Sequence, residues 1–229
     1  MISVCMATFN GAKYIKEQVD SILSQLSSED ELVISDDGST DEIIAVLNNF
    51  NDVRIKIFHN ESRKGVVGNF ENALMNSKGD HVFLSDQDDI WLKGKVERCI
   101  KGLQTADLVV HDAVVVDADK NVINESFFAL RGSREGYFNN LIKNSFLGCC
   151  LAFRRETFSY IMPIPQVAMH DIWIGLMVSR KGKVEFINTP LMMYRRHGDN
   201  ASPTGEKSNF SVWKKISYRL KMFYHTILR

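Results

Sequence analysis

The chain has 229 residues, of which 45% are hydrophobic and 24% charged, and its 28 Lys and Arg balance its 28 Asp and Glu. This length can bury a sizeable core in one large domain, and the composition is ordinary for a soluble globular protein. A zero net charge gives no reason to expect a nucleic-acid partner, so local charge has to carry any argument about partners.

The cysteines and the N-terminal segment predict a cytoplasmic protein. Cys5, Cys99, Cys149 and Cys150 show no CxxC spacing, which favours buried free thiols in a reducing compartment over a disulfide framework or zinc site. The N-terminal segment lacks the basic and long apolar regions of a signal peptide. No stretch approaches the roughly 18 apolar residues that a membrane span requires.

The first half alternates apolar runs with apolar residues at helical spacing. Strands are expected at residues 2–6, 31–35, 53–58 and 81–85, and helices at 15–26, 43–47 and 66–77. This alternation indicates βαβ units and a parallel sheet, in which ligands bind beyond the carboxyl ends of the strands. Three polar clusters fall at such ends: Thr8-Phe9-Asn10, Asp36-Asp37 and Asp86 to Asp89. Their convergence predicts one shared site.

The second half is less regular. Strands are expected at residues 108–111, 113–116, 149–153, 183–187 and 191–195, with a helix after His170. The polar and aromatic segment 124–144 is expected to form a mobile region on the acceptor side. No internal repeat or low-complexity linker divides the chain.

The tail from Lys207 contains no acidic residue. Its apolar residues share one helical face and its basic residues lie elsewhere on the helix: Trp213, Ile216, Leu220, Phe223 and Ile227, against Lys214, Lys215, Arg219 and Lys221. A basic amphipathic helix can lie in a membrane interface. A terminal helix can equally pack its stripe on the core or on a second subunit. The sequence leaves both open.

The acidic cluster Asp86-Gln87-Asp88-Asp89 follows an apolar strand and precedes Ile90-Trp91. Adjacent carboxylates repel one another unless a cation or hydrogen bonds offset their charge. Oxygen ligands select Mg²⁺ or Mn²⁺, which proteins often share with substrate phosphates. A solvated acidic loop is the alternative, but the apolar flanks favour a metal site.

The other two clusters carry weaker signals when taken alone. Asp36 at a strand end can accept hydrogen bonds from a base or ribose, but Asp-Gly-Ser is also common turn chemistry. Thr8 and Asn10 taken singly indicate helix-capping residues.

Six short motifs in order make the pattern recognisable. They are Met6-Ala7-Thr8-Phe9-Asn10-Gly11, the segment Ile34 to Asp41, the segment Ser85 to Trp91, Gly148-Cys149-Cys150, His170-Asp171-Ile172-Trp173, and Tyr194 to Asn200. Together they resemble glycosyltransferase family 2 over about residues 1–200. The Asp-Gln-Asp-Asp-Ile-Trp form is most similar to the bacterial rhamnosyltransferase-like branch that builds surface polysaccharides. Ala7 departs from the proline of many members.

The resemblance implies an α/β fold of the GT-A type. A Rossmann-like, mostly parallel sheet would be flanked by helices, with a smaller acceptor-side subregion and a C-terminal amphipathic helix. Residues 1–205 would form the glycosyltransferase domain. Its halves would bind the nucleotide-sugar (1–105) and the acceptor (106–205), and residues 206–229 would form a basic amphipathic tail.

The resemblance also implies roles for single residues. Thr8, Phe9 and Asn10 would line the nucleotide-base pocket, and Asp36 would hydrogen-bond the base. A basic residue near this pocket is usual in the family. Arg63 and Lys64 could both fill this role, and the sequence does not distinguish them. We take Lys64 as the candidate.

The metal and catalytic roles follow in the same way. Asp86 would lie by the ribose and diphosphate, Asp88 would be the principal ligand of Mg²⁺ or Mn²⁺, and His197 would contact diphosphate or metal. A surface loop histidine is the alternative for His197. Asp171 would be the catalytic base. Displacement at an anomeric carbon needs such a base, and the dipole at a helix N-terminus keeps a carboxylate ionised. Asp171 could instead merely cap its helix.

The expected function is therefore metal-dependent, inverting transfer of a sugar from a dTDP- or UDP-sugar to a glycan or lipid-linked glycan at the inner face of the membrane. Rhamnose is the sugar that the branch suggests. A sugar nucleotidyltransferase is a second hypothesis, although Thr8-Phe9-Asn10-Gly11 has only one glycine where a phosphate loop needs several. A receiver-like domain or an inactive scaffold is a third. A receiver-like domain would leave the Asp86 cluster unexplained. An inactive scaffold is disfavoured because Asp86, Asp88 and Asp171 are all present.

Overall fold

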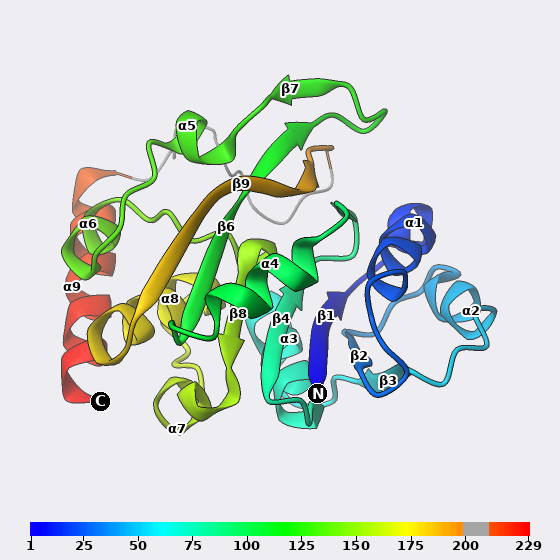
Figure 1. Ribbon diagram of the computed structural model, residues 1–229. Helices are drawn as coiled ribbons and strands as arrows, with labels where there is room; N and C mark the ends of the chain where they lie inside the picture. The colour runs from blue at the N-terminus through cyan, green and yellow to red at the C-terminus, as the bar shows by residue number, and fades with distance from the viewer. Residues whose placement is uncertain (199–210) are drawn as a thin grey trace.

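A curved sheet of nine strands runs through the part of the protein that the structure describes and carries helices around it (Figure 1). The computed structural model describes residues 1–198 and 211–229. The expected boundary at residue 205, the last two residues of the motif that ends at Asn200, and the start of the basic tail lie outside these ranges.

The first half confirms the predicted βαβ pattern. Its strands are β1 (Ile2–Thr8), β2 (Glu31–Asp36), β3 (Ile55–His59) and β4 (His81–Ser85), and the helices between them are α1 (Ala12–Leu23), α2 (Ile43–Asn48) and α3 (Val66–Asn76). These strands pair in parallel in the order β3-β2-β1-β4. The carboxyl ends of β1, β2 and β4 therefore meet at one edge, as the three polar clusters required.

The second half adds mixed pairings to this parallel core. Its strands are β5 (Ile90–Trp91), β6 (Leu108–Val116), β7 (Val122–Asn124), β8 (Leu151–Arg154) and β9 (Val184–Arg195). β8 lies antiparallel between β4 and β6, and β9 runs parallel to β6. β5 pairs antiparallel with β9, and β7 with β6. The full order is β3-β2-β1-β4-β8-β6-β9-β5, with β7 beside β6.

Two pairs of predicted strands are in fact single strands. Residues 108–111 and 113–116 both belong to β6, whose pairing with β9 shifts register next to Asp112. Residues 183–187 and 191–195 likewise belong to β9. The polar pair His111-Asp112 interrupts the apolar pattern, but both side chains are buried, and the Asp112 carboxylate accepts hydrogen bonds from the amides of Ala113 and Phe128. A satisfied buried carboxylate can lie inside a strand.

The second half contributes six α-helices and two 3₁₀ turns to the described part of the chain. They are α4 (Lys95–Gly102), α5 (Phe127–Arg131), α6 (Tyr137–Ile142), α7 (Phe158–Ile161), α8 (His170–Lys181) and α9 (Val212–Leu228), with 3₁₀ turns η1 (Gly148–Cys150) and η2 (Arg155–Thr157). The segment expected to be mobile, 124–144, contains α5 and α6. The predicted C-terminal helix is confirmed by α9, which packs against α6 and α8.

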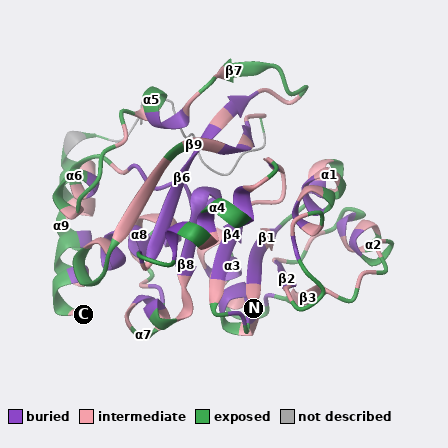
Figure 2. Ribbon diagram, viewed as in Figure 1, coloured by how far each residue is buried: buried purple, intermediate pink, exposed green. Residues whose placement is uncertain are grey.

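The core follows the central strands (Figure 2). Large side chains such as Phe70, Phe83, Phe153 and Trp173 are fully buried, and each contributes about 1.5–3 kcal/mol of hydrophobic stabilisation. The four cysteines are buried free thiols, as predicted. Across the described residues, every helix is too short or too polar to cross a bilayer.

Candidate active site

A cavity of about 390 Å³ opens at the carboxyl ends of β1 and β4. It is lined by residues of the predicted polar clusters, the start of α3, the turn η1, the start of α8 and the end of β9: Ala7, Thr8, Phe9, Asp37, Gly65, Val66, Asn69, Asp86, Gln87, Asp88, Leu147, Gly148, Met169, His170, Asp171 and Tyr194. The structure therefore brings the acidic cluster and Asp171, which are more than eighty residues apart in the chain, into one site.

The side chain of Gln87 joins the acidic cluster to the first motif. Its amide accepts a hydrogen bond from the Phe9 backbone N–H at 2.9 Å and donates to the Phe9 carbonyl at 3.0 Å. Gly11 makes room for this contact, because a Cβ there would lie 2.2 Å from the Gln87 Cδ. The sequence analysis gave Gln87 no role. Its place inside the Asp-Gln-Asp-Asp motif is the feature of the sequence that could have indicated a role for Gln87.

Of the residues predicted to line the nucleotide pocket, some line the cavity and others hold the surrounding loops in place. Phe9, with 55% of its surface exposed, and Thr8 line the cavity. Asn10 does not: its backbone has a φ of 49°, and its side-chain oxygen accepts the Thr40 N–H at 2.8 Å. Asn10 thus holds the loop after β2 against the first motif.

Asp36 is buried beneath the cavity wall. One carboxylate oxygen accepts from the hydroxyls of Thr8 and Ser39, and the other from the backbone N–H groups of Gly38 and Ser39. Burial alone raises the pKa of Asp36, but these hydrogen bonds outweigh it and hold the pKa below its usual value. Because its acceptor positions are used inside the protein, the observed role of Asp36 is to shape the turn, and Asp37 is the residue of this pair that faces the cavity.

The structure separates the two basic candidates. Arg63 donates to the Ile164 carbonyl at 2.9 Å and lies 3.4 Å from the Glu71 carboxylate, so it ties α3 to the segment before α8. The Lys64 ammonium donates to the Asn60 carbonyl at 2.6 Å and lies 3.7 Å from the Asp37 carboxylate. Lys64 is therefore beside the cavity rim, although it does not line the cavity.

The three aspartates of the acidic cluster have different environments. Asp86 and Asp88 line the cavity, whereas Asp89 is fully buried. Burial, then repulsion from Asp88, raises the pKa of Asp86 to about 7, and the same causes hold the pKa of Asp89 well above its usual value. Asp88 is paired with His197, whose Nε2 lies 2.8 Å from the carboxylate.

These residues fit a divalent cation. One oxygen of Asp89 is buried and has no hydrogen-bond partner among the described residues, and an unsatisfied buried carboxylate oxygen is costly. Within the described part of the chain, ligand atoms of Asp86, Asp89 and Cys149 lie within 4.8 Å of one another. Of the predicted ligands Asp86, Asp88 and His197, Asp86 belongs to this group, whereas Asp88 and His197 are paired with each other.

Arg195 holds the acidic cluster in place, a role that the sequence analysis missed. Its guanidinium donates to the Asp88 carbonyl at 2.8 Å and to the Glu17 carboxylate at 2.7 Å, and its backbone N–H donates to Asp89. It also lies 4.8 Å from the ring of Tyr14, on which His197 stacks. The Tyr-Arg-Arg-His motif contained this signal.

Asp171 stands in the first turn of α8 and faces the cavity. Its Oδ1 accepts the N–H of Ile172 at 2.7 Å. The N-cap residue of α8 is Met169, so Asp171 is not the cap that the alternative proposed. Burial raises the pKa of Asp171 to about 6.

His170 is a third residue to which the sequence analysis assigned no role of its own. The residue is 95% buried, and its ring stacks on Phe70 with centroids 4.2 Å apart. Neither ring nitrogen has a hydrogen-bond partner among the residues that the structure describes. Burial lowers the pKa of His170 to about 3, so the ring is neutral. Nε2 points toward Gly148, where a Cβ would lie only 2.7 Å away. Both residues line the cavity.

Comparison with known proteins decides the family. A model of glycosyl transferase family 2 matches residues 3–161, which include the first four of the six motifs. The chain belongs to glycosyl transferase family 2. The remaining two motifs supply Asp171 and His197 from beyond the matched range.

Curated relatives in this family cover most of the chain. An uncharacterized glycosyltransferase of Nostoc sp. is 30% identical over 90% of this chain and 69% of its own length. The Escherichia coli UDP-Glc:alpha-D-GlcNAc-diphosphoundecaprenol beta-1,3-glucosyltransferase WfaP is 27% identical over 99% and 93%. The Shigella flexneri dTDP-rhamnosyl transferase RfbG is 26% identical over 85% and 72%.

Solved structures confirm the GT-A fold. Residues 1–349 of Staphylococcus aureus TarS in complex with UDP-GlcNAc match with a TM-score of 0.74 and 17% identity, covering 100% of this chain and 66% of TarS. The mannosyltransferase PcManGT from Pyrobaculum calidifontis, in complex with GDP-Man and Mn²⁺, matches with a TM-score of 0.66 and 20% identity, covering 100% and 64%. The family 2 chain thus spans about two thirds of these structures.

Proposed function

We propose that this family 2 protein is a metal-dependent, inverting glycosyltransferase that moves a sugar from a nucleotide-sugar to a glycan or lipid-linked glycan in surface polysaccharide synthesis. The observation that carries the proposal is the shared cavity. It joins an acidic cluster suited to a diphosphate-bound cation with a separate carboxylate, Asp171, suited to a base.

The first motif and the loop after β2 would hold the nucleotide. The Phe9 ring and Thr8 offer a partly apolar wall for the base, and Asp37 adds carboxylate acceptors at the same wall. Asp36 and Asn10 would act by holding this wall in shape. Lys64, whose side chain is 62% exposed beside Asp37, is placed to approach the nucleotide from the rim.

Asp86, Asp88 and His197 would hold Mg²⁺ or Mn²⁺, and the ligand atoms of the buried Asp89 and Cys149 lie within 4.8 Å of that of Asp86. When bound, such a cation offsets the negative charge on the departing nucleoside diphosphate. The chain's own contribution is to keep three mutually repelling carboxylates together. Arg195 does this by contacting the backbone carbonyl of Asp88 and the Asp89 side chain.

Asp171 would take the proton of the acceptor hydroxyl. That oxygen forms the new bond to the anomeric carbon while the bond from this carbon to the diphosphate breaks, so the configuration inverts. A general base needs a pKa near the working pH, and a pKa of about 6 leaves Asp171 mostly ionised at neutral pH.

His170 would hydrogen-bond a sugar hydroxyl next to Asp171. A neutral imidazole offers one donor and one acceptor, and both nitrogens of His170 are unpaired in the cavity wall. A hydroxyl both donates and accepts, so one sugar hydroxyl at Nε2 would satisfy a buried group that otherwise costs stability.

The donor and acceptor follow only from the relatives. RfbG is named for transfer from dTDP-rhamnose, and WfaP for transfer of glucose from UDP-Glc to a diphosphoundecaprenol-linked sugar. We take dTDP-rhamnose and UDP-sugars as the donors to test. For the acceptor we propose a lipid-linked glycan presented at the cytoplasmic face of the membrane.

The test is a panel of nucleotide-sugars incubated with the protein and Mn²⁺, with release of nucleoside diphosphate as the readout. One preferred donor whose hydrolysis or transfer requires the cation is the expected result. Pyrophosphate release from a nucleoside triphosphate and a sugar phosphate would instead show a nucleotidyltransferase. Labelling by acetyl phosphate without nucleotide binding would favour a receiver-like domain, and inactivity on the whole panel a scaffold.

A further inference from the structure

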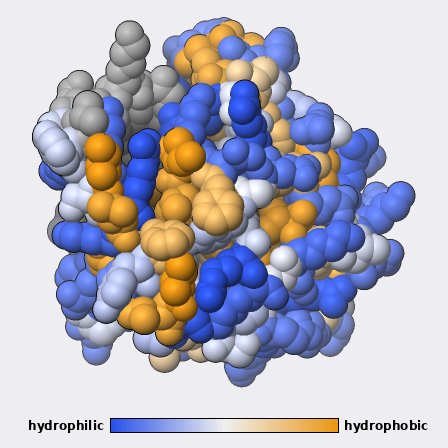
Figure 3. All heavy atoms as spheres, turned by 90° about the vertical axis from the view of Figure 1, so that its left-hand side faces the viewer, coloured by the Kyte–Doolittle hydropathy of each residue, from blue (hydrophilic) through white to orange (hydrophobic). Residues whose placement is uncertain are grey.

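The apolar stripe of α9 faces away from the protein. We define the outer ridge as the exposed apolar residues of this helix: Trp213, Ile216, Leu220, Phe223, Tyr224, Ile227 and Leu228. Trp213 is 81% exposed and Leu220 63% exposed. Figure 3 shows hydrophobic side chains gathered on this face of the molecule. A surface helix normally turns its apolar stripe inward, so this orientation is inverted.

The opposite side of α9 is anchored to the body. Met222 and Thr226 are buried there, and the Thr226 hydroxyl bonds the Tyr137 hydroxyl of α6. Arg180 of α8 donates to the Thr226 carbonyl at 2.7 Å. The ridge is therefore held outward by specific contacts on the other face of the helix.

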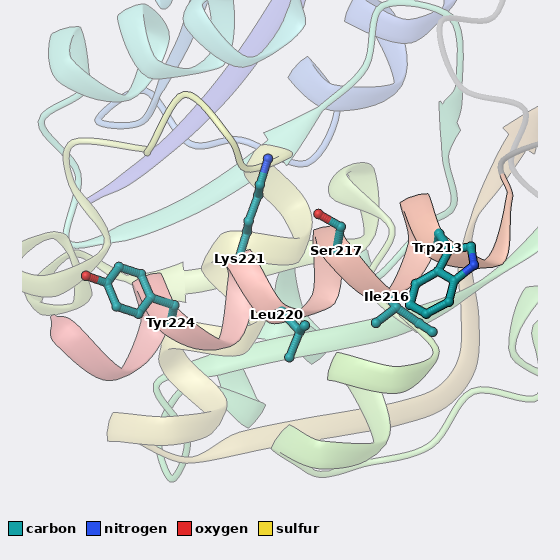
Figure 4. Close-up of a pocket in the computed structure, with 6 residues that line it drawn as sticks. All are labelled: Trp213, Ile216, Ser217, Leu220, Lys221 and Tyr224. Carbon is teal, nitrogen blue, oxygen red and sulfur yellow. The ribbon is translucent and has the colours of Figure 1, made fainter.

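The ridge forms a hollowed apolar surface. Trp213, Ile216, Leu220 and Tyr224 line a shallow depression of about 380 Å³ together with Ser217 and Lys221. Figure 4 shows that all six belong to α9 and that Lys221 points away from Leu220. The neighbouring helix α6 adds Phe138, which is 69% exposed, and Ile142, which is 62% exposed. An apolar surface of this kind marks an interaction site.

Charge selects the partner. Residues 211–229 include the cations Lys214, Lys215, Arg219, Lys221 and Arg229 and no acidic residue. A second copy docked on the ridge would bring the same cations together, and like charges at an interface are costly. An anionic lipid surface instead accepts both the apolar ridge and the flanking cations. We propose that the outer ridge binds the interface of anionic membranes.

The helix that carries the ridge, α9, also contacts the wall of the cavity. The backbone N–H of Met169 donates to the Tyr218 hydroxyl of α9 at 3.3 Å, and Met169 lines the cavity beside His170 and Asp171. A membrane bound at α9 would therefore lie on the Asp171 side of the site. The benefit for a lipid-linked acceptor rests on the proposed function, whereas binding to lipid does not.

Vesicles provide the test without any substrate. The chain has three tryptophans, and Trp91 and Trp173 are buried, so a change in fluorescence on binding reports Trp213. Vesicles of phosphatidylcholine with phosphatidylglycerol should shift this emission to the blue and sediment the protein, with affinity at least tenfold above that for phosphatidylcholine alone. Added salt should weaken binding.

Two variants separate apolar from charge contributions, and a third is the control. Leu220→Glu should lower partitioning at least tenfold, and a double change of Lys214→Gln and Lys221→Gln should remove most of the preference for anionic lipid. Met75→Glu, at a 73% exposed position of α3, should bind like the wild type. Release of nucleoside diphosphate in solution should be unchanged by Leu220→Glu, so loss of lipid binding is distinguishable from failure of the enzymatic proposal.

Other outcomes would overturn the inference. Equal partitioning of Leu220→Glu and wild type, or no partitioning at all, would exclude a membrane role for the ridge. A dimer seen by light scattering and dissolved by Leu220→Glu would assign the ridge to a second copy of the chain.

Discussion

Asp171 carries one backbone hydrogen bond and a raised pKa in the same carboxyl group. Its Oδ1 accepts the Ile172 N–H, which aims the group from the start of α8 into the cavity. Asparagine can keep that hydrogen bond through its side-chain oxygen but cannot take a proton. We expect Asp171→Asn to bind the nucleoside diphosphate like the wild type and to lose transfer by about 10²–10⁴-fold. Comparing kcat with nucleotide affinity checks this, and near-wild-type turnover would refute the assignment.

The pKa of Asp171 also predicts a pH dependence. Because burial raises this pKa to about 6, the base is protonated below that value and ionised above it. Transfer should therefore fall about tenfold for each pH unit below 6, and level off above 7. A pH profile of kcat/KM measures this directly. A profile that is flat between pH 5 and 7 would mean that another group accepts the proton.

A substitution at His170 can separate a hydrogen-bonding role of its two ring nitrogens from a packing role of the ring. His170→Phe keeps a ring to stack on Phe70 and removes two buried nitrogens that have no partner. Stability should be unchanged or slightly higher, because replacing an unsatisfied polar group by an apolar one is close to neutral. kcat/KM should fall about tenfold through the lost hydrogen bond. Unchanged kinetics would show that the histidine only fills space.

At the scale of elements, α3 can pack closely against the loop after β3 because Gly68 has no side chain. A Cβ on Gly68 would lie 1.8 Å from the backbone oxygen of Arg63. Alanine is favoured over glycine in a helix by about 1 kcal/mol, but overpacking against backbone costs about 1–3 kcal/mol or more. The clash should therefore exceed the propensity gain.

We expect Gly68→Ala to lower the melting temperature by about 2–8 °C, the range for a net loss of about 1–2 kcal/mol in a chain of this size. Gly198→Ala is the control, since among the described residues no atom lies within 4 Å of its added Cβ. If both variants melt like the wild type, α3 can shift away from the loop without cost.

The elements that the sequence predicted well are those whose signal is local. β1 to β4 and their helices follow from apolar periodicity, and the strand-end clusters at Thr8, Asp36 and Asp86 follow from parallel pairing. The continuity of β6 and β9 did not, because the buried carboxylate of Asp112 is satisfied by partners that only the tertiary structure supplies. A polar residue in an apolar run has no sequence signature for such partners.

The candidate site shows the same division. Motifs located Asp86, Asp88, Asp171 and His197, but not which carboxylates would face inward. Asp36 is enclosed by its own turn, and Asp89 is buried behind the cavity. Gln87, Arg195 and His170 were missed because their roles arise from contacts across long sequence distances, such as 78 residues between Gln87 and Phe9.

At the scale of the whole molecule, the fold combines three features: the cavity wall from the first half, which we propose binds the nucleotide; Asp171 of α8, the proposed base; and the outward ridge on α9. The orientation of the ridge could not be predicted, since helical periodicity defines a stripe but not the direction in which it faces. The structure settles that direction because Met222 and Thr226 on the other side are buried.

The central claim is that a divalent cation at the acidic cluster binds the diphosphate of the donor. Calorimetric titration with dTDP and UDP in Mn²⁺, and again after EDTA, tests it most directly. Asp88→Ala is the variant, and Asp20→Ala, at an exposed position of α1, is the control. We predict that one nucleotide binds wild type and Asp20→Ala only with Mn²⁺, and that EDTA or Asp88→Ala weakens binding at least about tenfold, or 1.4 kcal/mol. Equal affinity without the cation, or in Asp88→Ala, would contradict the account.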